Sequence, residues 1–143
     1  MFKLRRALFI FILLSFSLLS CKHKSILIIK KEVKMQLPGR LGSPKAAHYK
    51  VSFIPRIGSD QLSFQKIMLN EKELALNMFD NNGQKLTAFN PSDTVNLFFS
   101  NIGNEIQSLG ITDAKFVLFF FEKNKLKKTI IEKFESINSP INQ

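Results

Sequence analysis

The chain has 143 residues, which is enough for one domain, and its 15 phenylalanines could fill a sizeable core, so disorder over most of its length is excluded. Cys21 is the only cysteine, which excludes an internal disulfide, a thiolate metal cluster and a Cys-X-X-Cys redox pair. The net charge of +10 is uneven, because residues 22–56 hold nine Lys or Arg against Glu32 alone, while residues 57–143 are nearly neutral.

The first twenty residues have the pattern of a secretory signal peptide. Lys3, Arg5 and Arg6 precede an apolar run, Ala7 to Leu19, that is interrupted only by two serines. Thirteen residues in a helix span about 20 Å, which is less than a hydrocarbon core of about 30 Å. We therefore predict a removable leader over residues 1–20 rather than a permanent membrane helix.

The leader ends in Leu18-Leu19-Ser20-Cys21, which resembles the lipobox of bacterial lipoproteins. The resemblance implies that a lipoprotein signal peptidase reads Leu18, Leu19 and Ser20, and that Cys21 carries diacylglycerol on its sulfur and becomes the mature N-terminus. Two or three acyl chains would give a stable membrane anchor. The alternative is a buried structural cysteine after an ordinary secretory leader.

The resemblance also implies a location in the cell envelope. Lys22 follows the cysteine where an Asp would favour retention at the inner membrane, and no acidic tract follows it. We therefore expect a lipid-anchored protein at the outer membrane that faces the periplasm. Residues 21–25 would then be the lipidated N-terminus and a short spacer.

The basic residues that follow the anchor are a candidate surface for anionic lipid or for an acidic partner. A solvated basic face without a partner is the alternative. The candidate residues are Lys22, Lys24, Lys30, Lys31, Lys34 and Arg40.

The segment up to residue 89 reads as a series of short strands. We expect one or two strands in residues 25–37, a strand over residues 48–54, and a strand over residues 62–70 with a bulge near Gln65-Lys66, because the apolar parity changes there. Alternation continues through Leu74, Leu76 and Met78. Asp80-Asn81-Asn82-Gly83 predicts a tight turn that leads into a hairpin strand over residues 84–89.

The second half of the chain continues the pattern. We expect a strand over residues 94–100, one helical turn within residues 104–109, and a strand buried on both faces in the unbroken apolar run of residues 116–121. Lys123-Asn124 predicts a hairpin turn into another strand, although Leu126, Ile130 and Phe134 also recur at helical spacing. Residues 139–143 should form a disordered tail.

Seven or eight short strands with regular turns predict an all-β fold, a small antiparallel β-sandwich over residues 26–138. An α+β fold with a C-terminal helix is the alternative. In outline the domain resembles immunoglobulin-like or transthyretin-like modules of bacterial lipoproteins, although it has no tryptophan and no cysteine pair.

The sequence contains no pattern typical of an active site. His23 and His48 are not spaced as a metal-ligand pair, no serine lies in a Gly-X-Ser-X-Gly elbow, and Glu71 with Glu73 flanks a turn where charges are common. We therefore predict no enzymatic activity, no cofactor, no metal and no nucleic-acid partner. The expected role is a binding or scaffolding lipoprotein with a protein partner in the envelope, and the alternative is a small envelope enzyme or ligand carrier with a pocket between the sheets.

Overall fold

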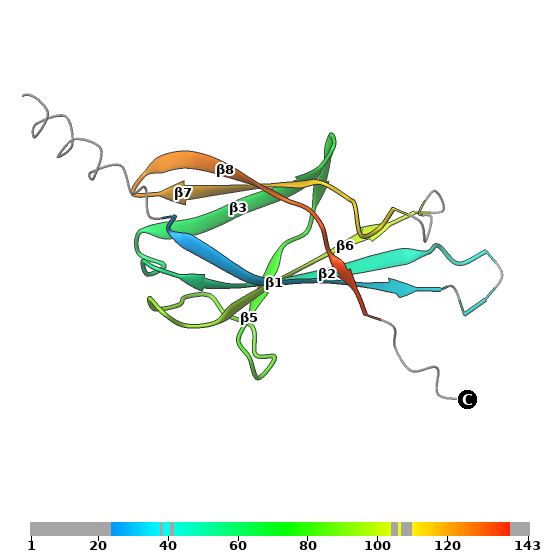
Figure 1. The fold of residues 1–143 in the computed structure, drawn as a ribbon, viewed down its shortest axis with the longest axis horizontal. Helices are drawn as coiled ribbons and strands as arrows, with labels where there is room; N and C mark the ends of the chain where they lie inside the picture. The colour runs from blue at the N-terminus through cyan, green and yellow to red at the C-terminus, as the bar shows by residue number, and fades with distance from the viewer. Residues whose placement is uncertain (1–23, 38, 41, 104–105, 107–109, 138–143) are drawn as a thin grey trace, which may run out of the picture.

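The computed structural model describes residues 24–37, 39–40, 42–103, 106 and 110–137. Over these residues nine strands form two stacked sheets, and no helix is present (Figure 1). The all-β sandwich predicted from the sequence is therefore confirmed, and the α+β alternative is wrong. The leader, Cys21 and the C-terminal tail lie outside the described residues.

The five-stranded sheet has the strand order β5-β6-β2-β1-β9. Its neighbours are antiparallel except for β1 and β9, which run parallel over two residue pairs. Its strands are β1 (Ile26–Gln36), β2 (Ala46–Pro55), β5 (Asn77–Phe79), β6 (Val95–Ile102) and β9 (Glu135–Ser136).

The four-stranded sheet has the order β4-β3-β7-β8, and all its pairs are antiparallel. The segment after β8 leaves this sheet and brings β9 to the edge of the other one, beside β1 (Figure 1). The strands of the four-stranded sheet are β3 (Leu62–Leu69), β4 (Lys72–Leu74), β7 (Phe116–Glu122) and β8 (Lys125–Ile131).

Aromatic rings join the two sheets. Tyr49 of β2 meets Phe116 of β7 edge-on at a centroid distance of 4.6 Å and stacks against Phe99 of β6 at 5.5 Å. Its hydroxyl donates a hydrogen bond to the carbonyl of Ile111. A second group of rings packs around Phe53. Because large apolar side chains from both sheets fill the interior, the sandwich needs no disulfide.

Several local predictions are confirmed. The bulge in β3 lies between Phe64 and Lys66, where the register shifts. The turn between β7 and β8 has positive φ at both Lys123 and Asn124, as a tight hairpin requires, so residues 125–131 form a strand rather than a helix.

Two strand predictions are wrong. The alternating residues from Leu74 to Met78 do not form one strand; β4 belongs to one sheet and β5 to the other, because the chain crosses between the layers there. Residues 84–89 are also not a strand: the turn at Asp80 forms, but only Phe79 and Lys85 make a bridge. The chain then turns inward and buries Phe89 in the core.

The expectation for β7 also needs correction. Its apolar run suggested burial on both faces, yet only one face of the strand is buried. Phe116, Leu118 and Phe120 point into the core, whereas Phe121 is 39% exposed. The reason is architectural, because no described element forms a layer on the outer side of the four-stranded sheet. The expected helical turn within residues 104–109 falls on residues that are mostly outside the described set.

Two phenylalanines of β7 provide a matched test of this arrangement. We expect Phe116→Ala to lower the free energy of unfolding by about 3–5 kcal/mol, because it opens a cavity beside Tyr49, and Phe121→Ala to lower it by less than about 1 kcal/mol. Urea unfolding followed by circular dichroism measures both. Equal losses would contradict the one-sided burial of β7.

Tyr49 gives the fold a dependence on alkaline pH. Burial raises the pKa of its phenol from 10.0 to about 12. Above pH 10.0 the unfolded chain loses this proton while the folded chain keeps it, so the contribution is complete below that pH and is lost as the pH rises toward about 12. We expect stability to fall over this window, and to fall less in Tyr49→Phe.

Because Tyr49 is the only tyrosine, the phenolate absorbance of the protein reports this one group. The folded protein should titrate with a midpoint near 12, and the urea-unfolded protein near 10. A midpoint near 10 in the folded state would show that the ring is not buried.

Candidate functional site

A groove opens along one side of the sandwich, between the start of β1 and β8. Its volume is about 680 Å³. Its apolar part comes from Ile26, Leu27 and Ile28 of one sheet and from Phe120 and Ile130 of the other. We call it the edge groove. The two strand segments that border it, the start of β1 and β8, lie at the end of the molecule where the described chain begins (Figure 1).

Both strands that border the edge groove are sheet edges there. β8 is the outermost strand of its sheet. β1 pairs with β9 only at Glu32 and Val33, so among the described residues its earlier part, from Ile26 to Lys31, has β2 as its sole strand neighbour. Edge strands present N–H and C=O groups that can pair with another extended segment. The groove therefore combines an apolar lining with two open strand edges.

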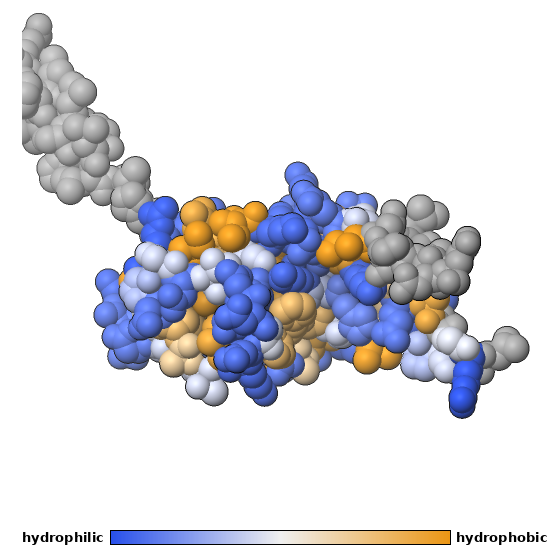
Figure 2. All heavy atoms as spheres, turned by 90° about the horizontal axis from the view of Figure 1, so that it is seen from below, coloured by the Kyte–Doolittle hydropathy of each residue, from blue (hydrophilic) through white to orange (hydrophobic). Residues whose placement is uncertain are grey.

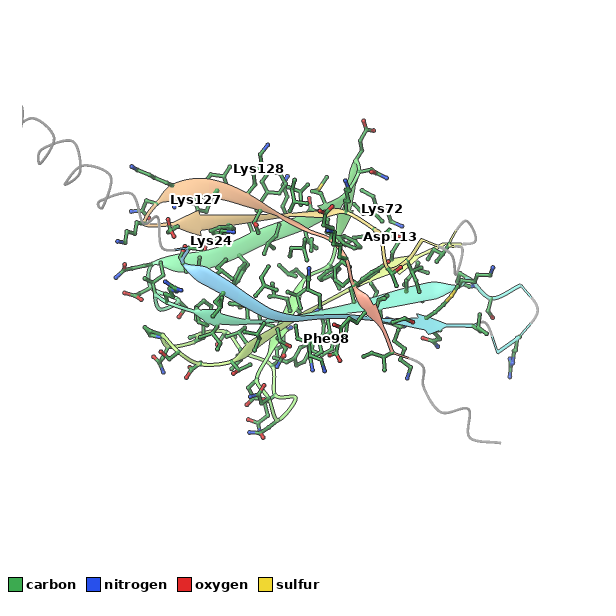
Figure 3. All side chains as sticks on the ribbon, viewed as in Figure 1. Lys24, Lys72, Phe98, Asp113, Lys127 and Lys128 are labelled. Atoms are coloured by element: carbon green, nitrogen blue, oxygen red, sulfur yellow. The ribbon has the colours of Figure 1, made fainter. Side chains whose placement is uncertain are left out.

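The charged residues of the edge groove are predominantly basic. Lys24, Lys127 and Lys128 lie together at this end of the sandwich (Figure 3). Glu122 is the acidic residue of the lining, and its carboxylate forms an ion pair with Lys127. Two cationic side chains then remain in excess, which suits a negatively charged ligand or segment.

The basic residues singled out from the sequence do not form one surface. Lys24 borders the edge groove. Lys30 pairs with Glu32 at 2.5 Å, and this hydrogen bond raises its pKa. Lys31 donates to the carbonyl of Glu132 and so ties β1 to the segment that follows β8.

The remaining members of that set lie elsewhere. Lys34 pairs in register with His48, toward the far end of β1, and Arg40 lies in the loop between β1 and β2. Lys22 is outside the described residues, as are Leu18, Leu19, Ser20 and Cys21. Successive side chains of β1 point to opposite faces of the strand, so the neighbours Lys30 and Lys31 are separated. A count of charges along the sequence does not show this separation.

Sequence reasoning did not identify Lys127 and Lys128 as groove residues. Both belong to residues 57–143, which are nearly neutral overall, so the net charge of that segment did not indicate a basic surface. The strand after the Lys123-Asn124 turn was predicted, but its position beside β1 depends on the strand order, which the sequence did not reveal.

His48 alternates with the buried Ala47 and Tyr49 along β2, so it lies on the outer face of the five-stranded sheet. Seen from this side, hydrophilic and hydrophobic residues are mixed over the surface (Figure 2). Its Nδ1 is 2.7 Å from the hydroxyl of Ser100, and its Nε2 is 2.8 Å from the side-chain oxygen of Gln36. An amide oxygen only accepts, so Nε2 carries the proton and Nδ1 accepts from Ser100. The three side chains form a chain of hydrogen bonds across three adjacent strands.

This chain resembles a serine–histidine pair but lacks the carboxylate of a hydrolytic site. The third member is neutral Gln36, which offers less stabilisation to an imidazolium than a carboxylate does. The residue directly across from His48 in the strand register is Lys34, which is not a carboxylate either. Cross-strand polar packing accounts for the arrangement.

Two further features are absent from the described residues. No group of three or more His, Cys, Asp or Glu side chains is placed to hold a metal ion. That part of the chain also has no helix with the length and apolarity needed to cross a bilayer.

A fluorophosphonate probe tests whether the Ser100 hydroxyl is an activated nucleophile. We expect no covalent labelling of the folded protein, because the hydroxyl is not activated by a carboxylate-supported base. Intact mass spectrometry measures the adduct, with Ser100→Ala as the control. Stoichiometric labelling that disappears in Ser100→Ala would show that the pair is reactive.

Comparisons with known proteins leave the chain without a family. No family model matches it, and neither a curated protein nor a solved structure does so. The resemblance to bacterial lipoproteins therefore rests on residues 18–21 and the apolar segment before them alone.

Proposed function

We propose that the protein is a lipid-anchored component of the bacterial cell envelope, whose β-sandwich binds another envelope component without catalysis. Cys21 supplies the anchor, and the edge groove supplies the binding site. The outer membrane, on its periplasmic side, is the proposed location.

The observation that carries this proposal is the short distance along the chain between Cys21 and the edge groove. Lys24, which borders the groove, is three residues after Cys21. Three residues reach at most about 10 Å, even when fully extended. A lipid on Cys21 would therefore hold this end of the sandwich at the bilayer surface, and the groove would open beside the membrane.

The open edges suggest how a partner would bind. An extended segment that adds to β8 or to the first half of β1 would gain backbone hydrogen bonds, and its alternate side chains would reach the apolar lining. Lys24 and Lys128 favour acidic residues in that segment. The proposed partner is thus an envelope protein with an extended acidic stretch.

A ligand carrier is the second candidate, and the volume of the edge groove favours it. A cavity of about 680 Å³ is within the range of small-molecule sites. The described lining offers no nucleophile–base pair for turnover, so within this alternative binding is favoured over catalysis. Co-purification of a bound small molecule would select the carrier.

Crosslinking in living cells tests the proposed function. We place a photoreactive residue at Thr129, which lines the edge groove, and at Ile102, which is exposed on the other sheet. We expect position 129 to capture one reproducible envelope protein and position 102 not to do so. Lys24→Glu should weaken the capture several-fold.

The same crosslinking in the Cys21→Ser background is the control for the anchor. Capture at position 129 should disappear, because the protein no longer reaches the membrane where its partner resides. Identical capture from positions 129 and 102, or no capture at 129 with the anchor intact, would refute the proposal.

A further inference from the structure

The outer face of the four-stranded sheet is apolar and uncovered by the described chain. Strand register places Phe121 opposite Leu126 and Val117 opposite Ile130 on this side. Leu126 is 60% exposed and Ile130 is 63% exposed, in addition to the partly exposed Phe121. A contiguous patch of exposed apolar side chains is typical of a surface that binds a protein, a ligand or a membrane.

Lysines lie among these apolar side chains. Lys66 and Lys128 both pair in register with Phe119, one from each side. The ammonium of Lys66 is 5.4 Å from the centroid of the Phe119 ring, so its methylene stem covers apolar surface while its charge remains accessible. We call this surface the outer face and define it by Lys66, Phe119, Phe121, Leu126, Lys128 and Ile130.

Acidic residues are almost absent from this side. Among the described residues of β3, β7 and β8 that share it, none is Asp or Glu, and Glu73 lies in β4 at the margin farthest from β8. A second copy packed on the same face would bring Lys66 and Lys128 toward their own counterparts, which costs free energy when they are desolvated. A planar anionic surface suits both the lysines and the apolar side chains.

We infer that the outer face docks on an anionic bilayer, with Leu126, Phe121 and Ile130 entering the interfacial region and Lys66 and Lys128 contacting lipid phosphates. Interfacial binding of this kind combines buried apolar area with attraction between lysines and anionic headgroups. The turn between β7 and β8 lies at the same end of the molecule as the start of β1 (Figure 1), so the docked sheet would adjoin the anchor.

The docking goes beyond the proposed partner binding, and only its orientation relative to the anchor rests on lipidation of Cys21. With the anchor in place the sandwich would lie on its four-stranded sheet. The edge groove would then open sideways along the membrane. Lys128 and Ile130 line the groove and also belong to the docked face, so an extended partner would reach the groove from the side of Lys24 and β1.

The chain contains no tryptophan, so single tryptophans can report contact with lipid. We introduce Leu126→Trp or Ile130→Trp. The matched control is Ile102→Trp, because Ile102 is 54% exposed on the five-stranded sheet. The full-length lipidated protein is reconstituted in phosphatidylcholine vesicles with brominated acyl chains, with and without phosphatidylglycerol. Bromine quenches tryptophan only on close approach.

We expect fluorescence at positions 126 and 130 to be quenched several-fold more than at 102, and only when phosphatidylglycerol is present. Lys66→Glu combined with Lys128→Glu, added to Ile130→Trp, should remove the excess quenching, as should 1 M salt, where the Debye length is about 3 Å. Circular dichroism verifies that each variant is folded.

Equal quenching at all three positions, or none at 126 and 130, would overturn the inference. A concentration-dependent blue shift of the Ile130→Trp emission without lipid would assign the face to a second copy instead. The same protein without the lipid is then added to the vesicles. Quenching at 126 and 130 would still be expected, so failure of the anchor and failure of the docking give different results.

Discussion

The packing of Tyr49 against Phe116 joins the two sheets, and the remaining architecture depends on it. With one ring from β2 and one from β7 in edge-on contact, the layers are held together without any covalent link. Only the face of β7 that carries Phe116 can pack against the other sheet. The other face of the strand, with Phe119 and Phe121, is left on the outside.

That constraint explains why the surfaces of interest gather at one side of the molecule. β7 and β8 carry the outer face and also line part of the edge groove, with Lys128 and Ile130 belonging to both surfaces, and β1 begins next to them. The described chain enters the fold at the same place, with Lys24. The opposite sheet differs: its outer surface carries a polar network of His48, Ser100 and Gln36.

Much of the fold could be predicted from local chemistry. The bulge in β3 follows from a change of apolar parity within one strand, and the turn at Lys123 and Asn124 follows from residues placed where positive φ is required. Such features depend on a few consecutive residues. The short strands β4, β5 and β9 could not be predicted in this way, because each exists only through a partner that is distant in the sequence.

The candidate site likewise has one part that local sequence predicts and one part that it does not. Lipidation of Cys21 is a prediction from four adjacent residues, and Cys21 lies outside the described residues. The edge groove requires the start of β1 and β8, which are far apart in the chain, to lie side by side, and no local pattern indicates that. The apolar run of β7 gave a misleading signal, since a strand buried on two sides and a strand that faces an outside partner can have the same composition.

The proposed location and function depend most on the state of the Cys21 sulfur. Mass spectrometry of the N-terminal peptide, from protein extracted from native membranes, measures it directly. We predict a peptide that begins at Cys21 and carries a diacylglyceryl thioether. A free thiol at this position, or a leader that is still attached, would contradict the account.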